Sequence, residues 1–113
     1  MQYMIMNWVK PSDFAKNGDD EIDPSAWGAY TKALIDAGVM RGGNALKPSL
    51  TASTVRVRDG QREVQDGPYA DTKEHLGGYY LIEVPDLDEA LAWAARNPAA
   101  STGAVEVRPV FTA

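Results

Sequence analysis

Residues 66–80, DGPYADTKEHLGGYY, join a turn to the start of an apolar strand. Asp66, Gly67 and Pro68 suit a tight turn, because Asp bonds back to its own backbone, Gly supplies a positive φ and Pro fixes the next φ. The strand that follows, residues 79–84, is apolar on both faces and is therefore expected at the centre of a sheet. His75, which is the only histidine of the chain, lies between the turn and this strand.

Residues 3–9, YMIMNWV, form a second strand with apolar side chains on both faces. These two strands are predicted to form the central pair of one sheet. Residues 54–58 and 105–110 alternate apolar and polar side chains, so we expect them to flank that pair. Asp59-Gly60 is a hairpin signal that predicts a return strand at residues 62–65. Residues 39–50 are predicted to form a turn at the paired glycines and a short extended piece at 45–47.

Two helices are predicted. Asp23 is a suitable N-cap and Pro24 suits the first helical position, with Gly38 as the stop. The expected buried stripe of this helix is Trp27, Tyr30, Leu34 and Ala37. The loop before it, residues 10–22, contains at most a short helical turn at 13–15.

The second helix begins at a capping box formed by Asp86 and Glu89 and ends before Asn97-Pro98. Trp93 lies off its predicted stripe and is expected to contact a loop or a partner chain. The residues of that stripe are Leu87, Ala90, Leu91 and Ala94.

The order of these elements indicates an α+β fold of the ferredoxin-like type, with one domain over residues 1–113. Two helices cover only one face of such a sheet, which leaves Met4, Met6 and Trp8 exposed on the other. A second copy packed sheet to sheet about a two-fold axis would cover them. We therefore expect a homodimer built as a dimeric α+β barrel.

Composition excludes several classes of function. The net charge is −5 and no basic patch is visible, which argues against nucleic-acid binding. The chain has no cysteine, so disulfides, thiolate catalysis and cysteine-ligated metals are excluded. No apolar run reaches the ~20 residues of a membrane span. Residues 1–9 resemble a strand rather than a signal peptide, and we expect a cytoplasmic protein.

The stretch that contains His75 is the best candidate for chemistry. Histidine exchanges protons near neutral pH, and Asp66 or Glu74 would orient it or tune its basicity. Lys73 would hold an anionic group of a substrate. The hydroxyl of Tyr69, Tyr79 or Tyr80 would donate to an oxyanion, and Trp27 would form an aromatic wall of the pocket. These roles suit removal of a proton next to a carbonyl, followed by elimination or isomerisation without a cofactor.

Several of these residues also have a purely structural interpretation. The turn alone explains Asp66, core packing explains Trp27, and residues 72–75 suit a short solvated helical turn. A metal site is not expected, because one histidine among scattered carboxylates has no recognisable ligand spacing.

Residues 66–69, DGPY, together with 71–74, DTKE, and 76–80, LGGYY, resemble the DGPF motif of the YCII-related family. Tyr69 stands where the motif has phenylalanine. Asn97-Pro98 and residues 105–109 resemble the same family, so the similarity extends over nearly the whole chain. This resemblance implies a dimeric α+β barrel, a bacterial origin and a family whose biochemistry is largely unknown.

The resemblance also implies two kinds of function. Some YCII relatives are thought to use a His–Asp pair to eliminate from or isomerise small ring compounds, with the histidine on the first helix. This chain keeps Asp36 near the end of that helix but has no histidine there. Genes of DGPF-type proteins often lie beside those of extracytoplasmic-function sigma factors. We therefore weigh a small-molecule-binding homodimer with lyase or isomerase activity against a non-catalytic accessory or regulatory protein.

Overall fold

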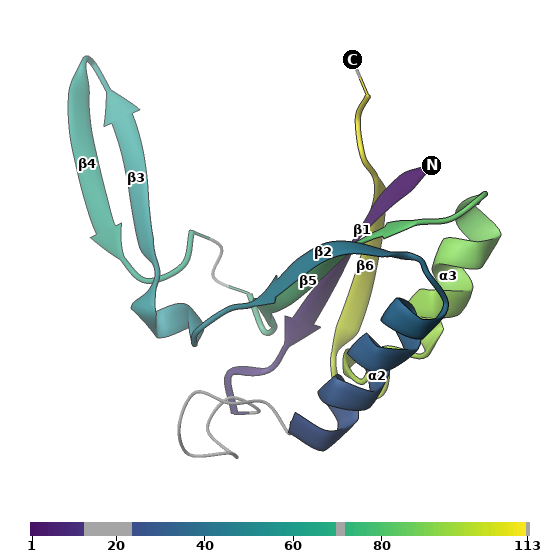
Figure 1. The fold of residues 1–113 in the computed structure, drawn as a ribbon. Helices are drawn as coiled ribbons and strands as arrows, with labels where there is room; N and C mark the ends of the chain where they lie inside the picture. Colours follow the sequence, from purple (N-terminus) through teal and green to yellow (C-terminus); the bar gives the residue numbers. More distant parts are fainter. Residues whose placement is uncertain (13–23, 70–71, 113) are drawn as a thin grey trace.

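The computed structural model describes residues 1–12, 24–69 and 72–112, and these form an α+β fold (Figure 1). A four-stranded antiparallel sheet has the order β2-β5-β1-β6, which is the ferredoxin-like order. The predicted fold class is thus confirmed. The strands of this sheet are β1 (Gln2–Val9), β2 (Met40–Ala45), β5 (His75–Glu83) and β6 (Ala104–Pro109).

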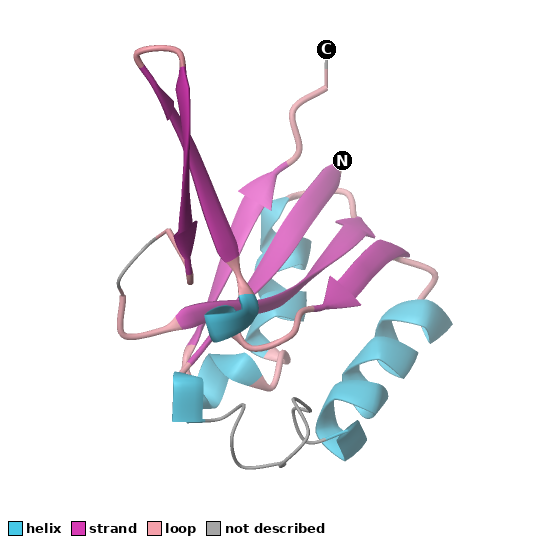
Figure 2. Ribbon diagram, turned by 90° about the vertical axis from the view of Figure 1, so that its left-hand side faces the viewer, coloured by secondary structure: helices cyan, strands magenta, loops and turns pink. Residues whose placement is uncertain are grey.

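The helices α2 (Pro24–Asp36) and α3 (Leu87–Ala95) cover one face of the sheet (Figures 1 and 2). A short helix, α4 (Ala99–Thr102), places Ala99 against Val9, and a 3₁₀ turn, η1 (Ser49–Thr51), follows β2. No helix in the described part of the chain is long and apolar enough to cross a membrane. The core between sheet and helices consists of Tyr3, Ile5, Tyr30, Leu34, Tyr80, Ile82, Val84 and Ala90.

The central pair of strands is the predicted one, because β1 pairs with β5 and β6 pairs with the other edge of β1. Side chains of β1 alternate strictly between buried and half-buried. The buried ones face the helices. The half-buried ones lie on the opposite side, which we call the open face; its apolar residues are Met4, Met6, Trp8, Leu76, Tyr79 and Leu81.

The strand that flanks β5 differs from the prediction. β2, and not the strand at residues 54–58, pairs with β5, and the expected turn at the paired glycines is extended. A Cβ on Gly43 would lie 2.6 Å from the carbonyl oxygen of Tyr79, so only glycine lets β2 approach β5 this closely. The alternation of apolar and polar residues could not predict β2, because this strand is placed by the close approach of Gly43 to β5. β5 also begins at His75 rather than at Tyr79, with a bulge opposite Asn7 and Trp8.

The strands β3 (Ser53–Arg58) and β4 (Gln61–Asp66) form a separate two-stranded sheet, which we call the arm. Asp59 and Gly60 have φ values of 53° and 73°, as a two-residue hairpin turn requires, so the hairpin signal is confirmed. The arm projects from the side of the sheet opposite the helices (Figures 1 and 2). At its root the Gly67 amide donates to the Ala52 carbonyl at 2.7 Å. Gly67 itself has the positive φ, 96°, expected of the turn.

The helix signals are confirmed in part. Gly38 ends α2 with a φ of 74°, and the Asp86 carboxylate caps α3 by accepting from the Glu89 amide at 2.9 Å. Asp23 and most of the loop predicted at 10–22 fall on residues 13–23, outside the described part of the chain.

The buried faces predicted for the two helices are only partly correct. On α2, Tyr30 and Leu34 are buried while Ala37 is exposed. On α3, Leu87 and Leu91 are about half exposed, and Trp93 packs on the core beside Tyr30, with ring centroids 6.5 Å apart. The helix is rotated so that a tryptophan and two small alanines, Ala90 and Ala94, face the sheet. Trp93 therefore packs on the core and on Tyr30 of α2, which the predicted stripe did not include.

Candidate functional site

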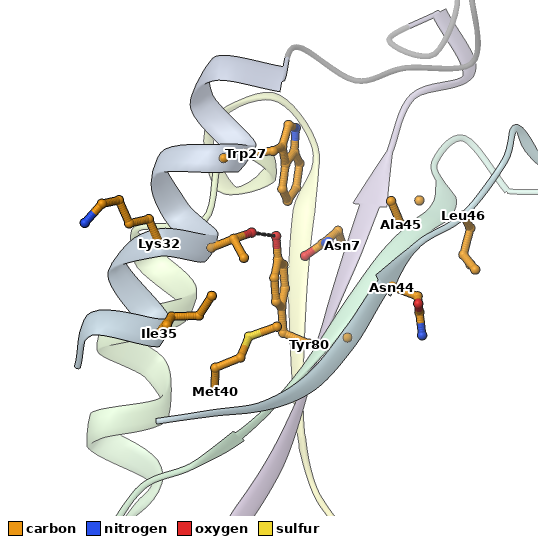
Figure 3. A pocket seen from close by; sticks show the side chains of 13 residues that line it. Asn7, Trp27, Lys32, Ile35, Met40, Asn44, Ala45, Leu46 and Tyr80 are labelled. Atoms are coloured by element: carbon orange, nitrogen blue, oxygen red, sulfur yellow. Dashed lines mark hydrogen bonds between the residues drawn. The ribbon is translucent and has the colours of Figure 1, made fainter. Parts of the chain in front are cut away.

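Two cavities lie beside the segment that leads from β2 into η1, and Leu46 lines both. The helix-side cavity lies between α2 and β2 and has a volume of about 640 Å³ (Figure 3). The arm-root cavity lies where the arm meets the sheet and has a volume of about 590 Å³. Both volumes are in the range of small-molecule sites.

The helix-side cavity contains two of the predicted ligand-binding residues, Trp27 and Tyr80. The Tyr80 hydroxyl and Thr31 Oγ1 share a hydrogen bond of 2.9 Å, and burial raises the pKa of Tyr80. Lys32 reaches along the outside of α2 to Asp36, at 2.5 Å, and its ammonium points away from the cavity (Figure 3). Asp36 is thus held in an exposed ion pair, and this cavity has apolar walls with a hydroxyl pair inside.

The arm-root cavity contains His75, at the first position of β5. Its Nδ1 is hydrogen-bonded to the hydroxyl of Ser49, the first residue of η1. Nε2 has no hydrogen-bond partner among the described residues, so it is the ring nitrogen that would meet a ligand. The wall consists of Trp8, Leu46, Lys47, Pro48, Ser49, Thr51, Ala52, Ser53, Thr54, Pro68, Tyr69, Thr72, His75 and Leu76.

Of the predicted site residues, His75 and Tyr69 come together in the arm-root cavity. Asp66, Lys73 and Glu74 are not among the residues that line either cavity. Asp66 is exposed on the arm opposite Ser53. Glu74 is directed to the α4–β6 connection, where its carboxylate lies 3.2 Å from the position of a Cβ on Gly103. Trp27 and Tyr80 belong to the other cavity, so the seven residues do not form one site.

Sequence reasoning missed three residues of the arm-root cavity: Ser49, Lys47 and Trp8. Ser49 lies 26 positions before His75, so no local spacing connects them. Lys47 provides the positive charge that we expected from Lys73. The Trp8 indole, which we predicted only as part of a face covered by a partner, donates to Glu106 at 3.1 Å and borders the cavity with its ring.

The sequence matches the YCII-related domain family over residues 1–113. The chain belongs to the YCII-related family. An uncharacterized protein of Rhizobium meliloti (strain 1021) is 39% identical in a match that covers 81% of this chain and 86% of that protein. The resemblance seen in the stretch from Asp66 to Tyr80 is therefore confirmed at the level of the family.

Another YCII-like fold is that of the 5-chloro-2-hydroxyhydroquinone dehydrochlorinase from Burkholderia phenoliruptrix AC1100, solved in complex with 2,5-dihydroxybenzoquinone. It aligns with 100% of this chain and 96% of its own, with a TM-score of 0.56 and 19% sequence identity. At that identity the likeness establishes a shared fold for this YCII-related chain.

Proposed function

We propose that this YCII-related chain acts as a single domain that binds a small organic molecule as a homodimer and catalyses a cofactor-independent elimination or isomerisation. The observation that carries the proposal is the position of His75, in the wall of a mostly apolar cavity with its Nδ1 on a hydroxyl. A dehydrochlorinase with the same fold supports the reaction class, because loss of HCl from a ring compound is an elimination.

In the proposed reaction, Nε2 of neutral His75 removes a proton next to a carbonyl or from a ring hydroxyl. The electron pair of the broken bond forms a new double bond as the bond to the leaving group breaks. The leaving group departs as an anion, and His75 holds the proton as an imidazolium. In an isomerisation, His75 returns that proton to another atom of the same substrate.

The residues around His75 suit a small, planar and acidic substrate. Lys47 would pair with an enolate or carboxylate oxygen, while Trp8 and Tyr69 would pack on a ring. Asp66, Glu74 and Lys73 have no direct part in this proposal, since they do not line the cavity. Tyr80 and Trp27 would bind apolar parts of a ligand in the neighbouring cavity.

The homodimer is proposed on the open face, as the sequence pattern indicated. Met4, Met6 and Tyr79 leave one side of the sheet apolar and only half buried. A second copy packed on it would remove that surface from water.

The first test is a thermal-shift screen of wild type and His75→Ala against hydroxyquinones, catechols, lactones and carboxylic acids. We expect at least one compound to raise the melting temperature of wild type and not that of the variant. Lys73→Ala serves as the control, because Lys73 is exposed and outside the cavity. Compounds that stabilise wild type and His75→Ala equally would contradict the site. The absence of any ligand would favour the accessory or regulatory function.

A further inference from the structure

We infer that the arm packs on a second copy of the chain, so that the partner covers the arm-root cavity. This inference rests on the homodimer proposed above and adds a second contact surface to it. It starts from the three valines of the arm. Val55, Val57 and Val64 are 57%, 62% and 58% exposed, and Val55 pairs directly with Val64. They share one face of the hairpin, because side chains alternate along a strand.

The other face of the arm is polar and already has contacts. There Arg56 donates to Gln65 at 3.1 Å and lies 5.2 Å from the ring centroid of Tyr69. The two arm strands otherwise pack mainly on each other. An isolated two-stranded hairpin is at best marginally stable in water. An arm whose three valines are more than half exposed on one face, beside Arg62, would gain stability from a surface to lie on.

The shape of the whole chain points the same way. Its radius of gyration is 15.5 Å, whereas a compact domain of this length has about 13 Å. The arm and the open face lie on the same side of the sheet (Figures 1 and 2). Two copies related by a two-fold axis would place each arm beside the body of the other, and each valine face would meet an identical chain in an equivalent way.

The area of the interface favours a role for the arm. At about 4.8 Å between strands and 3.3 Å per residue, two open faces would bury roughly 900 Å² in total. Stable specific interfaces bury roughly 1,200–2,000 Å². If each arm also lay on its partner, the total would rise to about 1,700 Å². On this footprint the arms would nearly double the contact between two copies.

The polar groups of the open face are paired with one another, but Arg108 and Glu106 have side chains that are still 72% and 39% exposed and would lose hydration under a partner. The Trp8 indole is bonded to Glu106, Arg108 pairs with Glu106 at 2.9 Å, and the Asn44 amide donates to the Tyr79 hydroxyl at 3.0 Å. A partner seated there meets apolar side chains and polar groups that already have partners.

The cavity borders both surfaces. Trp8 and Leu76 belong to the open face, while Ser53 and Thr54 belong to the arm, and all four line the arm-root cavity. Tyr69, at its rim, is 73% exposed. A second copy on these surfaces would cover the rim and shield His75 from bulk water, which would strengthen electrostatic interactions with a bound substrate.

The test compares full-length wild type with Val57→Asp, Val64→Asp and the control Gln61→Asp. Gln61 pairs with Arg58 and lies on the polar face of the same arm, so it receives the same new charge without touching the valines. Sedimentation equilibrium should show dimers for wild type and Gln61→Asp. Both valine variants should dissociate at least tenfold more readily, with unchanged circular dichroism.

The outcomes separate the two proposals. If wild type and the valine variants form equally tight dimers, the role of the arm is wrong while the dimer stands. If wild type is a monomer at 100 µM, the dimer itself is wrong.

Modification by diethyl pyrocarbonate tests whether the cavity is covered, since His75 is the only histidine. We expect peptide mapping to show several-fold slower modification of His75 in wild type than in Val57→Asp, and equal rates would contradict a covered cavity.

Discussion

At the scale of single residues, the contact between Ser49 and His75 is the one that the chemistry depends on. A hydroxyl can donate to Nδ1 or accept from Nδ1–H, and the proposed base requires the second arrangement, in which Nε2 keeps its lone pair for the substrate. Ser49 is a positioning residue in this account, because it acts through His75.

We predict that Ser49→Ala changes the tautomer ratio of His75 and costs about 1 kcal/mol or less in stability, since one partly exposed hydrogen bond is lost. Long-range ¹H–¹⁵N spectra give the ratio without ambiguity, because only one imidazole contributes. Ser49→Thr keeps the hydroxyl and should restore the wild-type ratio. An unchanged ratio in Ser49→Ala would show that the hydroxyl does not select the tautomer.

Tyr30 provides a pH dependence of stability. Burial raises the pKa of Tyr30 to about 12, and its hydroxyl donates to the Trp93 carbonyl at 2.8 Å. Unfolded tyrosine titrates near 10. Between about pH 10 and pH 12 the unfolded chain releases this proton while the folded chain keeps it, so the stability that Tyr30 contributes is complete below pH 10 and falls as the pH rises through 12.

Tyr30→Phe should therefore be about 1 kcal/mol less stable than wild type at pH 7, because the Trp93 carbonyl loses one of its two donors and keeps only the Arg96 amide. The difference in unfolding free energy between wild type and Tyr30→Phe should narrow at pH 10.5 and above, because phenylalanine cannot ionise. Urea unfolding at pH 7 and at pH 10.5 measures this difference. A deficit that stays constant with pH would contradict the role of burial.

At the scale of elements, β2 depends on a single glycine. Gly43 has a φ of 156°, and an added Cβ would lie 2.6 Å from the Tyr79 carbonyl oxygen. Gly43→Ala is expected to destabilise the chain by roughly 1–3 kcal/mol through backbone strain and overpacking. Gly42 is the matched control, because its Cβ would meet only Leu81, at 3.7 Å. Chemical denaturation should show Gly42→Ala within about 0.5 kcal/mol of wild type, and equal effects of the two changes would contradict this account.

The elements that could be predicted from sequence are those with a local chemical signature. The central strands are apolar on both faces, Asp86 caps its helix, and Asp59-Gly60 closes its hairpin. β2 could not be found in this way, since it is placed by the fit of Gly43 against a strand about 36 residues later. The orientation of α3 was predicted wrongly because the buried stripe was placed through Leu87 and Leu91. In the structure the larger Trp93 side chain packs on the core instead.

The candidate site was predictable only in part for the same reason. His75 could be chosen as the only histidine, and Tyr69 lies near it in sequence and in space. The carboxylates near it in sequence do not belong to the cavity, because Asp66 is exposed on the arm and Glu74, in the bend before β5, is directed to Gly103. Its partner, Ser49, comes from a distant turn that only the folded chain brings to the cavity.

At the scale of the whole molecule, folding and association should be linked. A chain whose arm and open face are buried by a second copy gains stability from mass action. We expect the melting temperature to rise by roughly 2–4 °C for each tenfold increase in protein concentration. Calorimetry between 1 and 100 µM measures this. In Val57→Asp the melting temperature should begin to rise only at higher protein concentrations than in wild type. A wild-type melting temperature that does not change with protein concentration would contradict the linkage.

The three tryptophans of the chain lie in three different places. Trp8 borders the arm-root cavity on the open face, Trp27 lines the helix-side cavity, and Trp93 lies between α3 and the core with the Arg96 guanidinium 4.4 Å from its ring centroid. Indole fluorescence responds to the polarity around the ring. Phenylalanine replacements that leave one tryptophan at a time would therefore give three intrinsic optical reporters. Their emission would distinguish association, ligand entry and unfolding in one cuvette without an added dye.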